Sequence, residues 1–131
     1  MPAAESYPDD LRYHPEHDWA RVDGDEATLG VTWFAQDSLG ELVHYEAPEA
    51  GMTVSKDKSY GEVESVKAVS DIIAPLSGEV LAVNDKVVSE PETVNDDPYG
   101  EGWLIRIRMS DPGELDSLLD AEAYRAVVAE S

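Results

Sequence analysis

The chain has 131 residues, of which 29 are Asp or Glu and 9 are Lys or Arg, and its formal net charge is −20. A field of this sign opposes binding to nucleic-acid phosphate or to an anionic membrane surface, and it favours a monomer that stays in solution. The absence of cysteine excludes a disulfide framework, a thiol nucleophile and a thiolate metal site.

The amino-terminal residues predict no targeting or membrane segment. Residues 1–10 read MPAAESYPDD, without the basic and apolar regions of a secretory signal, and no apolar run in the chain approaches the length of a membrane span. We therefore expect a cytoplasmic protein, with a loose leader over residues 1–10 and a single domain over residues 11–131.

Two histidines follow the leader in the segment YHPEHDW. His14 and His17 lie three residues apart among carboxylates, a pattern that can suggest zinc. Pro15 opposes the helix that would align them, and no third strong ligand is obvious. We therefore expect no metal site in this segment.

Patterns typical of β-strands dominate the chain. The Asp23-Gly24 dipeptide is typical of a hairpin turn and predicts paired strands over residues 19–22 and 27–32. Apolar and polar residues alternate over residues 103–109, which predicts a half-buried strand. Other strands are expected over residues 41–47, 52–54, 60–65 and 79–83.

Two segments carry helix signals. Thr32 can cap a short helix over residues 33–39. Asp111 and Glu114 have the spacing of a capping box and predict a helical tail, whose apolar stripe changes phase near Asp120. We expect the tail to break there and to dock on the β body.

The stretch over residues 61–75, GEVESVKAVSDIIAP, places Lys67 between two segments rich in β-branched and acidic residues. A strand, a tight reversal and a second strand would put this lysine at the exposed tip of a hairpin. A lone lysine in such a place is usually a solvated turn residue. The turn is also atypical, because Val66 resists the positive φ that two-residue hairpin loops favour.

The order GEVESVKAVSD resembles the lipoyl-lysine segment of the glycine cleavage system H-protein family. The resemblance extends over residues 13–129. Near the start of the chain, Tyr13, His17 and Trp19 match the family's Tyr and His-Glu-Trp, with Asp18 in place of the glutamate. The segment NDDPYGEGW matches a second family motif, whereas Trp33 stands where the family usually has aspartate.

The resemblance implies a mainly β fold of the lipoyl/biotinyl type, a flattened barrel or a sandwich of two antiparallel sheets, with a short internal helix and C-terminal helices. It also implies a type I-like turn and lipoate bound covalently to Lys67. The cleft for the loaded arm would include Asp18, Ser38 and Asp71. The hairpin residues recognised around the lysine would be Glu64, Ser65, Val66, Ala68, Ser70 and Asp71.

The function implied by the resemblance is a non-catalytic shuttle. Its arm would carry an aminomethyl group from a pyridoxal-phosphate glycine decarboxylase to a folate-dependent aminomethyltransferase, and electrons to dihydrolipoyl dehydrogenase. A lipoate ligase or lipoyl transferase would modify the lysine. Consistent with this, the sequence contains no pairing of nucleophile and base and no phosphate-binding loop.

Two alternatives remain open at this point. A lipoyl relay protein, which donates its lipoate to other carriers, would have the same sequence pattern. From a different class, an unmodified acidic interaction protein could occupy the basic groove of a nucleic-acid enzyme, and the net charge supports it. An adduct on Lys67 distinguishes a lipoylated carrier from the acidic interaction protein.

Overall fold

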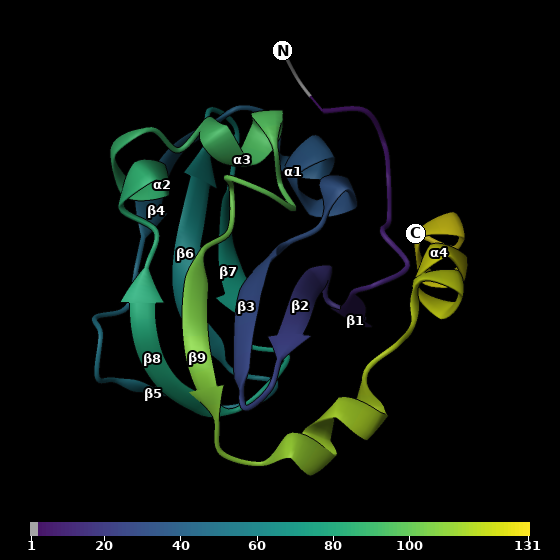
Figure 1. Cartoon of the computed structure of the whole chain (residues 1–131). Helices are drawn as coiled ribbons and strands as arrows, with labels where there is room; N and C mark the ends of the chain where they lie inside the picture. Colours follow the sequence, from purple (N-terminus) through teal and green to yellow (C-terminus); the bar gives the residue numbers. More distant parts are fainter. Residues whose placement is uncertain (1–2) are drawn as a thin grey trace.

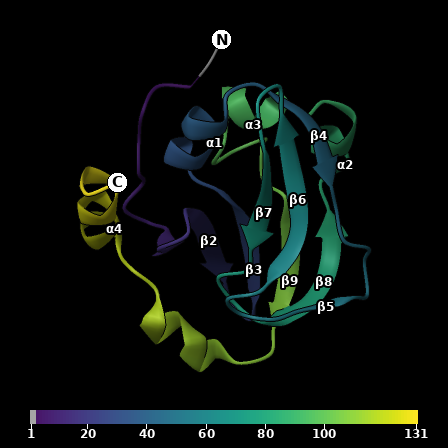
Figure 2. The same ribbon diagram turned by 180° about the vertical axis from the view of Figure 1, so that it is seen from behind.

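The structure is a computed structural model that describes residues 3–131, and two antiparallel β-sheets form its centre (Figures 1 and 2). The predicted mainly β fold is confirmed, and the sheets form a sandwich instead of closing into a barrel. The larger sheet contains, in spatial order, β1 (Arg12–His14), β2 (Asp18–Asp23), β3 (Glu26–Val31), β9 (Ile105–Met109), β8 (Gly78–Val83) and β5 (Thr53–Val54). The smaller sheet contains β4 (Leu42–Glu46), β6 (Ser59–Ser65) and β7 (Val69–Ile73).

The helices are short and lie around the sheets. They are α1 (Trp33–Leu39), α2 (Asp85–Ser89), α3 (Thr93–Asp96), a 3₁₀ helix (Pro112–Ser117) and α4 (Ala121–Ala129). In Figures 1 and 2, α1 and α3 lie together at one end of the sheets, and α4 lies at the side, next to the amino-terminal segment. Within the described residues, none of these helices is long and apolar enough to cross a membrane.

The main core lies between the two sheets. In β9, Ile105, Ile107 and Met109 are buried and the two arginines between them are exposed, so the predicted alternation is confirmed. Residues from the smaller sheet, such as Val63 and Ile72, belong to the same buried cluster. Burial of one face of a strand fixes its register, because a slip by one residue would turn each apolar side chain to the solvent.

The predicted hairpin and internal helix are confirmed. Asp23 pairs with Glu26 across the first turn, where Gly24 has a φ of 65°. The Thr32 hydroxyl accepts the N–H of Ala35 at the start of α1. Gly40 follows the helix with a φ of 85°, a conformation that favours glycine.

A second cluster of aromatic residues attaches α4 and the amino-terminal segment to the larger sheet. The ring of Tyr124 stacks on Tyr13, with 4.7 Å between their centroids, and Tyr7 packs edge-on against it. Residues 3–10, for which we expected a loose leader, form no helix or strand, but Tyr7 is buried and Ala3 accepts the indole N–H of Trp33. Residues 1 and 2 lie outside the described part of the chain.

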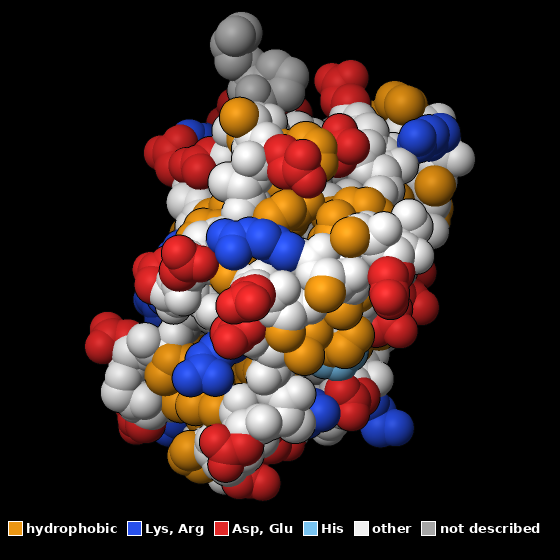
Figure 3. Space-filling view, turned by 90° about the vertical axis from the view of Figure 1, so that its right-hand side faces the viewer, with side chains coloured by type: hydrophobic (Ala, Val, Ile, Leu, Met, Phe, Trp, Pro, Cys, Tyr) orange, Lys and Arg blue, Asp and Glu red, His pale blue; other side chains and the backbone are white. Residues whose placement is uncertain are grey.

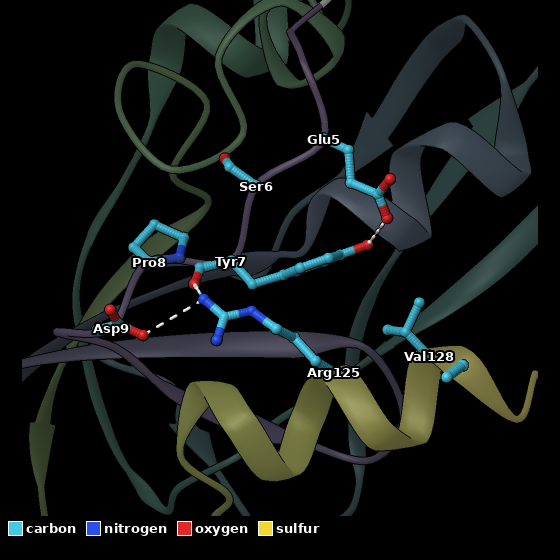
Figure 4. A pocket seen from close by; sticks show the side chains of 8 residues that line it. Glu5, Ser6, Tyr7, Pro8, Asp9, Arg125 and Val128 are labelled. Carbon is cyan, nitrogen blue, oxygen red and sulfur yellow. Dashed lines mark hydrogen bonds and ion pairs between the residues drawn. The ribbon is translucent and has the colours of Figure 1, made fainter.

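The amino-terminal segment and α4 enclose a hollow of about 770 Å³ (Figure 4). Arg125 of α4 reaches across it and donates to the carbonyl of Tyr7 and to the carboxylate of Asp9. Figure 3 shows this side of the molecule, where acidic side chains are spread over the surface with hydrophobic atoms exposed between them. No residue of the β6–β7 hairpin lines this hollow.

The helical tail begins differently from the prediction. Asp111 caps a 3₁₀ helix by accepting the N–H of Gly113, and a new helix begins after Asp120, so the predicted break is confirmed. The predicted capping box between Asp111 and Glu114 is wrong. Both carboxylate oxygens of Glu114 instead accept from Ser77, one from its N–H and one from its hydroxyl. This contact joins the tail to the loop before β8, a partner that local sequence spacing does not reveal.

Candidate functional site

Lys67 lies at the exposed tip of the hairpin formed by β6 and β7. The two strands are paired antiparallel up to Glu64 and Val69, so four residues separate the ends of the ladder. Within residues 3–131, the ammonium group of Lys67 forms no ion pair. The amine is therefore held outside the body of the protein and is accessible to another macromolecule.

The side chain of Ser65 builds the turn at this tip. Its hydroxyl oxygen accepts the N–H of Lys67 at 3.3 Å and the N–H of Ala68 at 3.1 Å, and its own N–H donates to the Ala68 carbonyl at 2.7 Å. Ser65 is buried, whereas Val66, Lys67 and Ala68 are exposed. Among the described non-glycine residues, only His17 and Asp57 have positive φ, so the turn accommodates Val66 without the left-handed conformation.

The tip is also supported from the α1–β4 connection. The N–H of Val66 donates to the carbonyl of Glu41 at 3.3 Å. The neighbouring residues are held by Asn95, whose side chain accepts the N–H of Leu42 and donates to the carbonyl of Gly40, each at 2.9 Å. A Cβ placed on Gly40 would lie 3.8 Å from Cε of Lys67, so the stem of the lysine lies against this connection.

The surface around the lysine is acidic with a few apolar side chains. Val66 and Val69 are 73% and 60% exposed. Glu64 is exposed beside them, Ser70 is half-buried and Asp71 is exposed further along β7. Of the predicted recognition residues, Ser65 is therefore the one that the fold buries, and its contacts are with the backbone of the turn.

A hollow of about 590 Å³ lies beside β7, and the first residue of this strand that lines it is Ser70, three residues after Lys67. Its lining residues are His14, Glu16, His17, Asp57, Ser70, Asp71 and Ile73. Nε2 of His14 lies 2.7 Å from the carboxylate of Asp57, and this hydrogen bond, together with one from Lys56, lowers the pKa of Asp57. The hollow thus combines three carboxylates with two imidazoles.

Of the three residues predicted for the cleft, the structure places only Asp71 in the lining of this hollow. Asp18 is 2% exposed, and its carboxylate accepts the backbone N–H of Ile73 while its Oδ2 has no partner. Burial raises the pKa of Asp18 well above its ordinary value. Ser38 is exposed on α1 and does not line the hollow.

The sequence did not predict that Glu16 and His17 line this hollow, or that Tyr124 contacts His17. Nδ1 of His17 lies 2.8 Å from the hydroxyl of Tyr124, which comes from the far end of the chain. The backbone of His17 has a φ of 75°, which is uncommon for a residue with a side chain. The segment HPEHDW could have indicated the first two residues, but no local pattern connects it with Tyr124.

Both imidazoles of this segment have protein partners. Nδ1 of His14 accepts the N–H of Glu16 at 3.0 Å, while its Nε2 contacts Asp57. Across residues 3–131, no group of three or more His, Asp or Glu side chains has an arrangement that could hold a metal ion.

A sandwich of two antiparallel sheets with a lysine at the tip of a hairpin is a lipoyl-type fold. A crystal structure of a glycine cleavage system H protein from Mycobacterium marinum superposes with a TM-score of 0.86 at 41% identity, covering 93% of this chain and 98% of that one. The family model for the glycine cleavage H-protein matches residues 11–131. This chain belongs to the glycine cleavage H-protein family.

Individual relatives are similar over nearly their whole length. The glycine cleavage system H protein of Symbiobacterium thermophilum is 52% identical over 123 residues, which cover 94% of this chain and 96% of that protein. The probable glycine cleavage system H protein of Haloarcula marismortui is 51% identical over 118 residues, which cover 90% and 93%.

Proposed function

We propose that this chain is the lipoylated shuttle of a glycine cleavage system, with lipoate joined through an amide to Nζ of Lys67. One observation carries the proposal: the lysine extends from the tip of a hairpin that the rest of the fold holds in place. Family membership supports the same conclusion.

The residues around Lys67 fit a covalent arm. Its amine is exposed, and no neighbouring carboxylate in the described part of the chain forms an ion pair with it. Ser65 and Glu41 fix the backbone of the turn, so that an attached group would swing about a fixed root. A lysine amine is protonated at neutral pH, so a lipoate ligase or lipoyl transferase would have to deprotonate it and supply activated lipoate.

When bound, lipoate would supply a disulfide that could be reduced on taking up an aminomethyl group at a pyridoxal-phosphate glycine decarboxylase. Transfer of that group to a folate-dependent aminomethyltransferase would leave a dithiol, which dihydrolipoyl dehydrogenase would oxidise back to the disulfide. The chain's own part would be non-catalytic. Tethering would give each partner a high local concentration of the arm, and the acidic rim formed by Glu64 and Asp71 would orient the chain toward basic surfaces of its partners.

The hollow beside β7 would hold a protonated amine at the end of the arm. Asp71 and Glu16 supply carboxylates to the lining, and Ile73 supplies an apolar side chain. A carboxylate that receives a cationic amine forms a charge-assisted hydrogen bond, which is stronger than one between neutral groups. Of the residues predicted for the cleft, this role would remain with Asp71.

A reconstituted system tests this function. The lipoylated chain is added to a glycine decarboxylase, and exchange of labelled bicarbonate into glycine is measured. The proposal predicts exchange that depends on the chain and is lost in Lys67→Arg. A variant with Lys58→Arg, an exposed lysine away from the hairpin tip, should retain exchange. Exchange that survives Lys67→Arg would overturn the assignment of the arm.

A further inference from the structure

Three side chains from distant parts of the sequence form a continuous chain of hydrogen bonds that ends at the hollow beside β7. The N–H of Ala35 donates to the hydroxyl oxygen of Thr32 at 3.3 Å. That oxygen lies 2.7 Å from the hydroxyl of Tyr124, which lies 2.8 Å from Nδ1 of His17. Thr32 and Tyr124 are completely buried, whereas His17 lines the hollow.

The number of available protons fixes the direction of this chain. If Nδ1 of His17 carried a proton, it would donate to Tyr124, and Tyr124 would donate to Thr32. The hydroxyl proton of Thr32 would then be buried without an acceptor, because within residues 3–131 its oxygen forms hydrogen bonds only with Ala35 and Tyr124. If Thr32 donated to Tyr124 instead, the hydroxyl proton of Tyr124 would be the one without an acceptor. A buried unpaired donor costs about 1–3 kcal/mol.

In the opposite direction both hydroxyl groups have an acceptor. Thr32 donates to the oxygen of Tyr124, and Tyr124 donates to Nδ1 of His17, which therefore has no proton. We infer that Tyr124 is a positioning residue that holds His17 as a neutral imidazole with its proton on Nε2, so that helix α4 sets the charge and polarity of the hollow beside the lysine hairpin.

The environment of both rings keeps this geometry rigid. Tyr124 stacks on Tyr13 at 4.7 Å and its ring cannot move without opening the aromatic cluster. The imidazole of His17 packs against Phe34 with 4.6 Å between ring centroids. Burial of His17 lowers its pKa, which agrees with a neutral ring.

The consequence for the hollow is electrostatic. The titratable groups that line it are Glu16, Asp57 and Asp71, together with His14, which is paired with Asp57. A neutral His17 adds one N–H donor to the hollow and no positive charge, so it does not offset the negative charge of the carboxylates. A protonated His17 would repel a cationic amine. This consequence rests on the proposed function, since that function supplies the amine. The direction of the hydrogen-bond chain does not depend on it.

Long-range ¹H–¹⁵N correlation of histidine rings tests the inference on the unlipoylated chain. In the wild type, Nδ1 of His17 should show the chemical shift of an unprotonated nitrogen and Nε2 that of a protonated one. In Tyr124→Phe, which retains the stacked ring, Nδ1 loses its donor. The Nδ1 shift should then change, and the titration midpoint of His17 should rise by about 0.5 to 1 pH unit.

A matched control is Tyr45→Phe, which removes another buried hydroxyl, one that donates to the carbonyl of Leu104 in the main core. It should leave both His17 signals and the midpoint unchanged. A proton on Nδ1 in the wild type, or a Tyr124→Phe variant with the wild-type Nδ1 shift and midpoint, would overturn the inference.

Repeating the measurement in Lys67→Arg separates this inference from the proposed function. The tautomer of His17 should be the same in that variant, because the arm takes no part in the hydrogen-bond chain. A correct tautomer in a wild-type chain that carries no lipoyl group when purified from its own host would contradict the shuttle alone. An incorrect tautomer in a lipoylated chain would contradict the role of Tyr124 alone.

Discussion

The hydroxyl of Ser65 accepts the backbone N–H of Lys67 at 3.3 Å, so the residue that bears the amine is oriented by a side chain two positions earlier. The same oxygen accepts the N–H of Ala68. These contacts replace the glycine that a tight hairpin usually needs. They leave the side chain of Lys67 free while its backbone is fixed.

Replacing Ser65 with alanine should therefore loosen the tip without unfolding the protein. Two N–H groups lose their acceptor, and we expect a loss of about 1 kcal/mol in unfolding free energy. The amide exchange of Lys67 and Ala68 should accelerate more than that of β6. Ser59→Ala is the control, because Ser59 lies on the same strand but is exposed, and its hydroxyl donates to the carbonyl of Gly61. Equal exchange rates at the tip in wild type and Ser65→Ala would contradict the role given to Ser65.

Asn95 should be the most sensitive polar residue of the region. Its side chain joins Gln36, Gly40 and Leu42, and these contacts support the carbonyl that receives the N–H of Val66. Asn95→Ala should lower the unfolding free energy by about 2–4 kcal/mol, because several partly buried groups lose partners together. Urea denaturation measures this change.

Asn95→Asp gives a graded comparison, since it retains the oxygen that accepts from Leu42 and loses the donor to Gly40. Its stability should fall between those of the wild type and Asn95→Ala. If the alanine variant is as stable as the wild type, the connection between α1 and β4 does not depend on this side chain.

Local patterns predicted the elements whose signals lie within a few residues. Asp23-Gly24, the cap at Thr32 and the alternation of β9 each gave the correct element, because turn geometry, capping and strand period are local. Long-range contacts were not predictable in this way. The carboxylate of Glu114 has the spacing of a capping box, yet Ser77 provides it with two donors from another part of the chain.

The candidate site also has one part that the sequence predicted and one part that it did not. The position of Lys67 at a hairpin tip followed from the strands around it and from the family resemblance. The hollow did not, because its residues come from the segment before β2, from Asp57 and from β7. Asp18 was expected in the cleft, but its place on β2 buries it, since an inward-facing position on a central strand lies in the core.

Asp18 should make stability depend on pH. Burial raises its pKa in the folded state, with a further contribution from Glu16, whereas in the unfolded chain the pKa is near the ordinary value of about 3.9. The folded protein therefore binds the proton more tightly. The unfolding free energy contributed by this group falls as pH rises from about 4 through the folded-state pKa.

Asp18→Asn should remove this pH dependence. The unfolding free energy of the variant should therefore fall less than that of the wild type between pH 4 and neutral pH, as measured by urea denaturation over this range. Asp23→Asn, an exposed aspartate on the same strand, should leave the pH dependence as it is. An unchanged profile in Asp18→Asn would show that the buried carboxyl does not titrate with unfolding.

The net charge of −20 predicts a response to salt. Repulsion among surface carboxylates destabilises the compact state, and screening at molar salt relieves it. The melting temperature should therefore rise from low to molar sodium chloride. A melting temperature that stays level or falls would contradict a role for charge repulsion in setting stability.

The most direct test of the account is the intact mass of the protein purified from its own host. We predict one added lipoyl group, present in the wild type and in Lys58→Arg and missing in Lys67→Arg. An unmodified wild-type chain, or an adduct that remains in Lys67→Arg, would contradict the claim that this lysine carries the cofactor.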